Sequence, residues 1–296
     1  MTHLDRDPKT ISSQDRALLC APVFIVGSGR SGTTWLQRLL TEFDGVISGQ
    51  ESHFFFMFNQ AFEDVETQAA TPRKTGLSCY WKIDEFYTEM QQVWMKTFSP
   101  LLQQSNNPQL LVEKTPGHAL YISRIAKFLP KSRFIHVIRD SRAVSASLIA
   151  ASKNWGSNWA AGSAKSSATE WWRMVTAARN PALRQDPSRY LEVHYEDLHK
   201  DTGKELKKVL DFTGIKYPET ALEAAVESQR FAKQKKSGGT NIADVRGTIL
   251  REPDGFFRKG EIDSWKKDLS FIQKLIIWRY TRRLMRECGY SWDGRV

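Results

Sequence analysis

The sequence contains no long hydrophobic run. Nowhere in its 296 residues does an uninterrupted apolar stretch reach the roughly eighteen residues that a membrane-spanning helix needs. Residues 1–20 are polar and mixed in charge, and they lack the apolar centre of a signal peptide. We therefore expect a cytoplasmic protein that does not associate with a membrane.

Cysteine is scarce as well. The three cysteines, Cys20, Cys79 and Cys288, are odd in number and far apart in the chain. No pair has the spacing of metal ligands, and no disulfide framework is implied. This pattern favours free thiols in a reducing compartment, and we expect no bound metal.

Clustered basic residues are also missing, although the chain carries a formal net charge of +10. The densest basic stretch, at 233–236, is interrupted by a glutamine, and the remaining Lys and Arg residues are dispersed. A positive excess favours anionic partners, but its dispersal argues against nucleic acid. We expect a small anion held in a pocket.

Short β-branched and apolar runs alternate with helical patterns. Strands are expected at 23–26, near residue 48, and at 110–112, 134–138 and 190–193. Helices are expected at 33–41, 118–128, 141–151, 166–180, 202–212, 219–229 and 270–287. This alternation predicts a three-layer α/β fold, with a mostly parallel central sheet of P-loop type flanked by helices. Ligands bind at the carboxyl ends of the strands in such folds.

The chain divides into three stretches of different character. Residues 1–20 are expected to be a loosely held lead-in, and residues 21–296 to form a single domain. Within that domain, residues 52–109 are rich in Phe, Gln, Glu, Tyr and Trp, with helical patches and no clear strand. This stretch predicts a helical insertion, which forms either a wall of a binding site or a plain helical subdomain.

The glycine-rich segment 27–34, Gly-Ser-Gly-Arg-Ser-Gly-Thr-Thr, joins the first strand to the first helix. Glycines allow backbone N–H groups to approach a ligand, and the helix N-terminus contributes its positive end. Glycines in some strand–helix turns serve packing alone. The strand–loop–helix context nevertheless favours an anion-binding loop.

Two familiar loop types match this segment incompletely. Gly27, Gly29 and Gly32 fit the dinucleotide pattern GxGxxG, whose acidic partner would be Glu51, slightly late in the sequence. Gly27, Gly32 and Thr34 fit the triphosphate P-loop, but Thr33 replaces the lysine that reaches the β- and γ-phosphates. The positive charge stands three residues earlier, at Arg30. That placement suits a single 5′-phosphate with a charged group attached to it.

Two further motifs contain an arginine. In one it directly follows a strand, and in the other it lies in a basic loop. Arg139 follows the strand 134–138 directly, and Ser147 stands eight residues later on the next helix. An arginine and a hydroxyl so placed can bracket a second phosphate, although a plain helix start with a surface arginine has the same pattern. The third motif is the basic loop Arg258-Lys259-Gly260. A short basic loop of this kind is also typical of ordinary solvated surface.

Together the three motifs resemble those of the 3′-phosphoadenosine-5′-phosphosulfate (PAPS)-dependent sulfotransferases. The resemblance implies that the 5′-phosphate is held by Arg30, Ser31, Gly32, Thr33 and Thr34. It implies a 3′-phosphate site made of Arg139, Ser147, Arg258, Lys259 and Gly260, and places Trp35 against the adenine, unless Trp35 is simply a core residue. The cytosolic branch usually has lysine in place of Arg30, and its dimerisation motif is matched poorly at 267–270. The oligomeric state is therefore left open.

The same resemblance suggests the catalytic groups. Glu51, in the segment 49–54, resembles the glutamate of the P-E-T-H-F-F segment that serves as general base in many bacterial members. His53 is the competing base, because its ordinary pKa suits the task. Lys114 resembles the lysine of the family's E-K-T-P segment and would share the leaving oxygen with Arg30. The plainer interpretations are an ion pair of Lys114 with Glu113 or another surface acid, and a His118 that caps the next helix.

The implied reaction is an in-line transfer of a sulfuryl group from PAPS to a hydroxyl or amine, which releases 3′-phosphoadenosine-5′-phosphate (PAP). A small molecule or natural product is the expected acceptor, with residues 52–109 on the acceptor side. Whether the acceptor atom is oxygen or nitrogen is left open. The rival interpretations are a P-loop nucleotide or small-molecule kinase, a nicotinamide oxidoreductase, and a module that binds PAP or another polyanion without catalysis.

Overall fold

The computed structural model describes residues 11–67, 75–228 and 261–296, and its central feature is one sheet. In these ranges the strands are β1 (Val23–Gly27), β2 (Val46–Ser48), β3 (Leu110–Lys114), β4 (Arg133–Ile138) and β5 (Tyr190–His194). The α-helices are α1 (Ser13–Cys20), α2 (Thr33–Thr41), α3 (Phe54–Met57), α4 (Asn59–Thr67), α5 (Ile83–Phe98), α6 (Ile122–Phe128), α7 (Ser141–Ser152), α8 (Ala164–Ala178), α9 (Pro181–Arg184), α10 (Tyr195–Lys200), α11 (Thr202–Thr213), α12 (Glu219–Ser228), α14 (Trp265–Asp268) and α15 (Phe271–Glu287). Short 3₁₀ helices are η1 (Leu77–Cys79), η2 (Ser99–Gln104) and η3 (Pro116–Tyr121).

The strands lie in the order β2-β3-β1-β4-β5, and each neighbouring pair is parallel. In the register of β1 with its neighbours, Gly27 is opposite Val137 and Ile25 is opposite Lys114. The carboxyl ends of β1, β3 and β4 therefore meet at one edge of the sheet. The loops that follow these three strands are brought together there, as the sequence motifs require.

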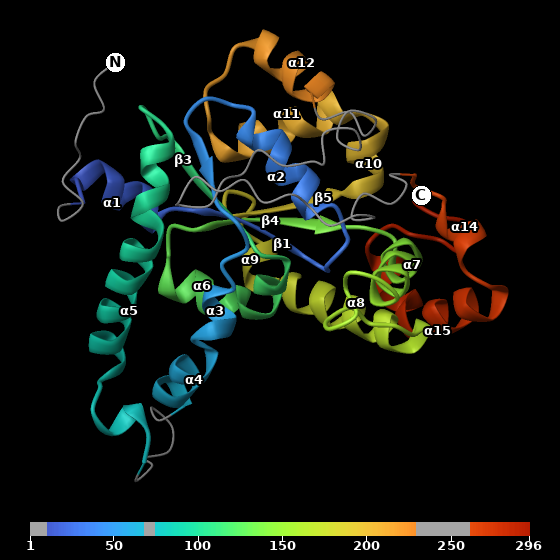
Figure 1. The fold of residues 1–296 in the computed structure, drawn as a ribbon, viewed down its shortest axis with the longest axis horizontal. Coiled ribbons are helices and arrows are strands. Elements are labelled where there is room, and N and C mark those ends of the chain that lie inside the picture. Colours follow the sequence, from blue (N-terminus) through green and yellow to red (C-terminus); the bar gives the residue numbers. More distant parts are fainter. Residues whose placement is uncertain (1–10, 68–74, 229–260) are drawn as a thin grey trace.

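Side chains of alternate strand residues form two separate cores. Val23 and Ile25 pack with Leu36 and Leu39 of α2 and with α11, whereas Phe24 packs on the opposite face with aromatic residues of α3 and α5. In Figure 1, α2, α10, α11 and α12 lie on one side of the sheet, and α3, α6 and α8 on the other. Strands buried on both faces read as continuous apolar runs. The expected three-layer α/β fold is confirmed.

The stretch between β2 and β3 is helical in its described part, as predicted. This stretch is part of the main hydrophobic core and not a separate subdomain, because Trp94 of α5 and Phe55 of α3 are fully buried against the sheet. The expected loose lead-in is wrong for its described end. Residues Ser13–Cys20 form α1, Leu19 is fully buried, and the carbonyl of Leu19 accepts a hydrogen bond from Trp94 at 2.8 Å. Burial of Leu19 and the N-cap at Ser12 stabilise this helix despite its polar surface.

Two histidines of the sheet, one buried and one half-buried, are held neutral by the fold. His136 of β4 is fully buried, and its Nδ1 lies 2.7 Å from the Tyr190 hydroxyl. Burial lowers the pKa of His136 to about 3, and burial together with Arg295 lowers the pKa of His194 to about 4. Protonating either imidazole would place an extra charge inside the protein.

We therefore expect the free energy of unfolding to fall as the pH is lowered from about 6.5 toward 3, because the unfolded chain then binds protons that the folded chain excludes. Replacing one histidine by a neutral residue, in His136→Asn, should reduce this pH slope by up to one proton, or about 1.4 kcal/mol per pH unit. Urea unfolding at a series of pH values measures both slopes. Equal slopes in the two proteins would contradict the expectation.

None of the helices in the described ranges is both long enough and apolar enough to cross a membrane.

Candidate functional site

The glycine-rich loop connects β1 to α2 through backbone that favours glycine at two points. Gly27 has φ +152°, and a Cβ there would lie 2.5 Å from the Val137 carbonyl oxygen of the neighbouring strand. Gly32 has φ +100°, and its Cβ would lie 2.4 Å from the ring of Tyr195. Gly32 is the N-cap of α2 and provides no side chain to cap it. The Gly32 cap therefore gives no side-chain acceptor to the first turn of α2, as at anion-binding helix starts.

Arg30 lies in the same loop with φ 70°, an uncommon value for a residue with a side chain. Its Nε donates a hydrogen bond to Ser147 Oγ at 3.1 Å, 117 residues further along the chain. Its guanidinium also lies over the ring of Trp155, 5.2 Å from the centroid. The structure therefore brings the first and second motifs into direct contact.

Arg139 directly follows β4 and is anchored from several sides. Its Nη1 donates to the Arg30 carbonyl at 3.3 Å, and its guanidinium lies 3.9 Å from the centroid of the Tyr195 ring. Its own carbonyl accepts a hydrogen bond from Trp171 Nε1 at 2.9 Å. The Nε of Arg139 is buried and has no hydrogen-bond partner among the described residues. A buried donor without an acceptor calls for a ligand or a water.

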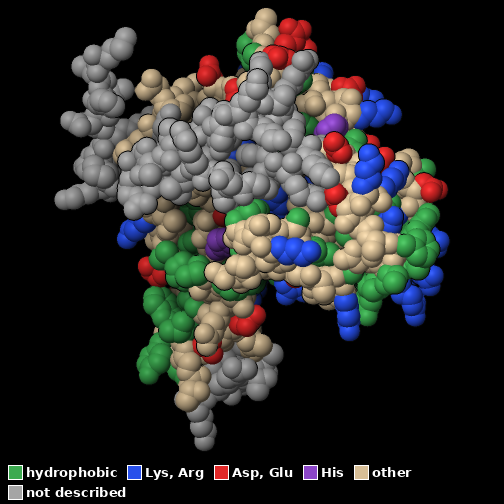
Figure 2. All heavy atoms as spheres, turned by 45° about the vertical axis from the view of Figure 1, so that its right-hand side comes forward, with side chains coloured by type: hydrophobic (Ala, Val, Ile, Leu, Met, Phe, Trp, Pro, Cys, Tyr) green, Lys and Arg blue, Asp and Glu red, His purple; other side chains and the backbone are tan. Residues whose placement is uncertain are grey.

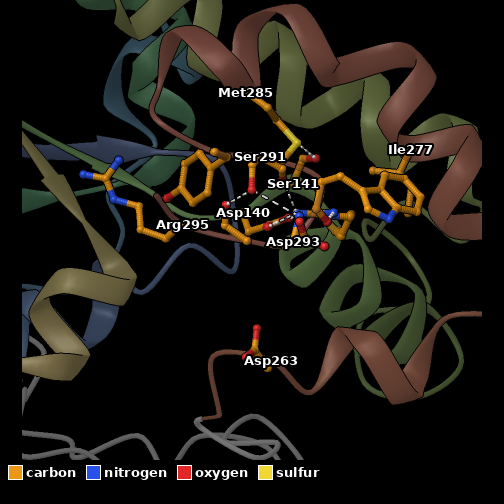
Figure 3. A network of polar contacts seen from close by, with 12 residues as sticks. Asp140, Ser141, Asp263, Ile277, Met285, Ser291, Asp293 and Arg295 are labelled. Atoms are coloured by element: carbon orange, nitrogen blue, oxygen red, sulfur yellow. Dashed lines mark hydrogen bonds and ion pairs between the residues drawn. The ribbon is translucent and has the colours of Figure 1, made fainter.

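Behind Arg139, a network of buried polar groups fixes the start of α7 (Figure 3). Arg142 is fully buried, and its Nε and Nη2 donate to the Asp140 carboxylate at 3.0 and 2.6 Å. The same guanidinium donates to the carbonyls of Ser291 and Trp292 and lies 3.8 Å from the Trp265 ring centroid. In Figure 3, Asp140, Ser141 and Ser291 lie together at the centre of the network. The C-terminal segment thus holds the residue next to Arg139 in place.

A second buried carboxylate completes this support. Glu196 accepts hydrogen bonds from the Asp140 backbone N–H at 3.0 Å and from the Tyr290 hydroxyl at 2.7 Å. Burial raises the pKa of Glu196, which the two hydrogen bonds partly oppose. Three chain segments distant in sequence, at Asp140, Glu196 and Tyr290, therefore meet directly behind the arginine.

The remaining loop residues differ in what they can offer an anion. Both the hydroxyl and the backbone N–H of Ser31 donate to the Ser28 carbonyl, so its donors are already used within the loop. Thr33 is buried and Thr34 is half-buried in the first turn of α2. Trp35 is half-buried, edge-on to Tyr195 with ring centroids 5.7 Å apart, and it also packs against the apolar core. This position is compatible with both interpretations of Trp35.

Glu51, His53 and Lys114 lie together beyond the ends of β2 and β3. Lys114 Nζ lies 2.5 Å from Glu51 Oε1, and its side chain is only 6% exposed, whereas that of Glu51 is 36% exposed. His53 Nε2 lies 3.6 Å from Glu51 Oε2, and its side chain is 52% exposed. The carboxylate is therefore shared between a buried ammonium group and an accessible imidazole. An acid–base group needs this kind of partial access.

Of the plainer interpretations, an ion pair of Lys114 with an acid is present, but its partner is not Glu113, and His118 does not cap the helix that follows it. Lys114 pairs with Glu51, not with the adjacent Glu113, because consecutive strand residues point to opposite faces of the sheet. His118 lies inside η3 and is the N-cap of neither η3 nor α6, whose N-caps are Thr115 and Tyr121. It is fully buried, with Nδ1 2.8 Å from Glu113 Oε2.

Arg258, Lys259 and Gly260 lie outside the described residues. The residue that follows them, Glu261, is described, and its carbonyl accepts a hydrogen bond from Arg139 Nη2 at 3.3 Å.

The structure adds two aromatic residues that sequence reasoning did not assign to the site. Tyr195 contacts Gly32, Trp35 and Arg139, and Trp155 lies beneath Arg30. Tyr195 is the first residue of α10 and directly follows β5, and none of the three sequence motifs includes it. No sequence pattern indicated a role for Trp155, because its contact with Arg30 depends on the path of the chain after α7.

No group of three or more His, Cys, Asp and Glu side chains suited to a metal ion occurs in the part of the chain that the structure describes.

Known proteins share both the sequence motifs and the fold. The family model described as "Sulfotransferase family" matches residues 22–219. Human Sulfotransferase 1C2 is 33% identical over 104 residues, which are 35% of this chain and 32% of that protein. Rat Sulfotransferase 2A1 is 25% identical over 183 residues, 58% of this chain and 62% of that protein. The matched segments of human Sulfotransferase 1C2 and of the mouse, rat and bovine Sulfotransferase 1A1 are short, at 32–40% of the length of those proteins.

Solved structures agree over most of the chain. The crystal structure of mouse sulfotransferase SULT7A1 complexed with PAP has a TM-score of 0.56 and 18% identity, and the match covers 93% of this chain and 90% of that one. The sulfotransferase domain from the curacin biosynthetic pathway has a TM-score of 0.55 and 19% identity, with 89% and 97% covered. These likenesses establish the fold. Because the family model matches well over half of the sequence, from residue 22 to residue 219, the chain belongs to the sulfotransferase family.

Proposed function

We propose that this chain is an enzyme that transfers a sulfuryl group from PAPS to a hydroxyl or amine of a small-molecule acceptor. The observation that carries the proposal is the direct contact between the two arginine motifs. Arg30 donates to Ser147, and Arg139 donates to the Arg30 carbonyl. Two cationic groups on adjoining loops can bind the two phosphates of one nucleotide.

Features of this chain fit such a donor without reference to its relatives. The uncapped start of α2 offers backbone N–H groups to one phosphate, and the buried Arg139 Nε offers an unused donor to the other. When bound, PAPS supplies the sulfuryl group and PAP is its leaving group. The likeness to a mouse protein complexed with PAP supports this choice. We further propose that Arg258, Lys259 and Gly260 contribute to the 3′-phosphate site, because the next residue, Glu261, lies at Arg139.

One general base and two cationic side chains would carry the chemistry. Glu51 is proposed to accept the acceptor's proton, since its carboxylate is partly exposed and fixed by Lys114. Lys114, together with Arg30, is proposed to stabilise charge on the leaving 5′-phosphate oxygen. His53 is the alternative base, because its imidazole is exposed beside the same carboxylate. In either case the charged groups are fixed in position before the reaction.

The surface beside these residues favours an apolar acceptor. Phe56 and Met57 of α3 follow His53 closely and are 63% and 70% exposed. Three additional exposed apolar side chains, Leu77, Tyr80 and Trp81, occur in the same inserted stretch. Figure 2 shows hydrophobic side chains gathered on the arm formed by the insertion. Residues 52–109 are therefore proposed to form the acceptor side of a single sulfotransferase domain at 21–296. A cytoplasmic location stays a prediction from the sequence.

The donor can be tested by thermal unfolding with PAP, ATP or NAD present. We expect PAP to raise the melting temperature, since saturation at a hundredfold over Kd stabilises a protein by about 2.7 kcal/mol. Arg139→Gln should remove most of this shift, because the neutral amide cannot bind a phosphate as strongly. Arg173→Gln is the matched control, since Arg173 lies exposed on α8 and pairs with Glu170.

The other outcomes of the thermal experiment separate the rival functions. Stabilisation by ATP with Mg²⁺ instead of PAP would indicate a kinase, and stabilisation by NAD an oxidoreductase. PAP binding without PAP release in the presence of PAPS and acceptors would indicate a binding module. Transfer itself is detected by PAP release together with the mass gain of one sulfuryl group on the acceptor.

A further inference from the structure

A buried carboxylate next to the site has no part in the proposed chemistry. Glu113 is the penultimate residue of β3 and is 3% exposed. Its side chain points to the face of the sheet opposite Lys114, toward α3 and η3. There Oε1 accepts hydrogen bonds from Ser52 Oγ at 2.8 Å and Thr115 Oγ1 at 2.6 Å, and Oε2 accepts one from His118 Nδ1 at 2.8 Å.

Each of these three donors also accepts a hydrogen bond from a backbone N–H group. The N–H of His53 donates to Thr115 Oγ1 at 3.4 Å, and that of Phe54 donates to Ser52 Oγ at 3.2 Å. The N–H of Phe55 donates to His118 Nε2 at 3.4 Å, which assigns the His118 proton to Nδ1. These N–H groups belong to the cap and first turn of α3, where a helix cannot satisfy its own donors. The Glu113 carboxylate therefore orients three side chains that together cap α3.

The capped segment is the one that carries Glu51 and His53. His53 is the N-cap of α3 and has φ 50°, a left-handed value that a residue with a side chain adopts at an energetic disadvantage. Such a conformation persists only where the surroundings hold it. The hydrogen bonds to the following amides provide that hold, and they all converge on Glu113.

We propose that Glu113 is a positioning residue, which fixes the Glu51–His53 segment so that the Glu51 carboxylate stays against Lys114. This inference rests on the proposed function, since it assigns Glu51 to the reaction. Glu113 itself does not touch the reacting atoms. Burial opposes its ionisation, but the hydrogen bonds from His118, Thr115 and Ser52 outweigh burial and hold the pKa of Glu113 below its usual value. The carboxylate is thus charged at every pH at which the enzyme would work, and it accepts all three hydrogen bonds.

Glu113→Gln tests the proposal with little change in size. The amide can no longer accept from all three donors, so the capping side chains lose their fixed orientation. We expect kcat to fall roughly 10- to 100-fold, as for other displaced catalytic groups, with KM for PAPS unchanged. We also expect the amides of His53, Phe54 and Phe55 to exchange with solvent roughly tenfold faster, because their acceptors are no longer held.

A matched pair at Thr115 covers the case in which Glu113→Gln does not fold. Thr115→Val removes the hydroxyl at nearly constant size and should reproduce the loss of kcat. Thr115→Ser keeps the hydroxyl and should recover most of it. A merely structural role predicts instead that both variants lose stability without separating kcat from KM.

Hydrogen exchange also separates this proposal from the proposed function. Unchanged exchange at residues 53–55 in Glu113→Gln and Thr115→Val overturns the positioning role, whatever happens to turnover. Faster exchange with undiminished kcat overturns it as well. If the unaltered protein neither binds PAP nor transfers a sulfuryl group, the proposed function fails. The proposal that Glu113 positions a catalytic segment fails with it, while the exchange data still establish whether Glu113 holds that segment.

Discussion

Glu51→Gln is expected to reduce sulfuryl transfer by about 10²–10⁴-fold, the usual contribution of a positioned general base. The amide keeps the shape of the carboxylate and can still accept a hydrogen bond from Lys114 Nζ, which lies 2.5 Å from Oε1. It cannot take a proton from the acceptor. Initial rates of PAP release with PAPS and a reactive acceptor measure the loss.

PAP binding should be nearly unaffected in the same variant, because Glu51 is not among the residues proposed to hold the two phosphates. The melting-temperature shift with PAP is the control for this. His53→Gln is the matched comparison, since His53 Nε2 lies 3.6 Å from the same carboxylate. Full activity in Glu51→Gln combined with a large loss in His53→Gln would transfer the role of base to His53.

Arg142→Met is expected to have the largest effect on stability, a loss of about 3–5 kcal/mol in the free energy of unfolding. Arg142 is fully buried, and its guanidinium forms an ion pair with Asp140, which is itself only 2% exposed. Methionine fills the space of the alkyl chain but leaves Asp140 as an unpaired charge in the interior. Urea unfolding at neutral pH measures the change.

Two further variants decide whether the buried charge is the cause. Arg142→Met combined with Asp140→Asn should recover much of the lost stability, since no uncompensated carboxylate then remains. Arg173→Met breaks the exposed pair with Glu170 on α8 and should change stability by less than about 1 kcal/mol. An additive double variant, with no recovery, would contradict this explanation.

The strands and long helices could be predicted from local patterns alone. Expected and observed bounds agree closely for β1, α2, β4, α7 and α15, because the strands are short buried runs and helices such as α2 and α15 carry an apolar face at the helical period. The helices α1, α9, α10 and α14 were missed. All four are short, and the stability of such helices comes from what they pack against, such as the contact of Leu19 with Trp94.

In the candidate site, too, some features could be predicted from local patterns and others could not. Arg30 and Arg139 could be identified because each stands at a strand end with a recognisable spacing to the following helix. Their mutual contact, through the Arg30 carbonyl, depends on β1 lying beside β4, which no local pattern encodes. The partners Tyr195 and Trp155 depend on the same long-range arrangement.

The sequence by itself determined which chemical groups the protein has at its strand ends and the family to which they belong. Only the tertiary structure decided which of those groups act on one another. Glu113 and Lys114 are adjacent in the chain, yet the alternation of a β-strand sends one into a buried hydrogen-bond cluster and the other to Glu51. Pairings of this kind depend on which faces the sheet brings together, so they follow from the packing of distant segments and not from their spacing.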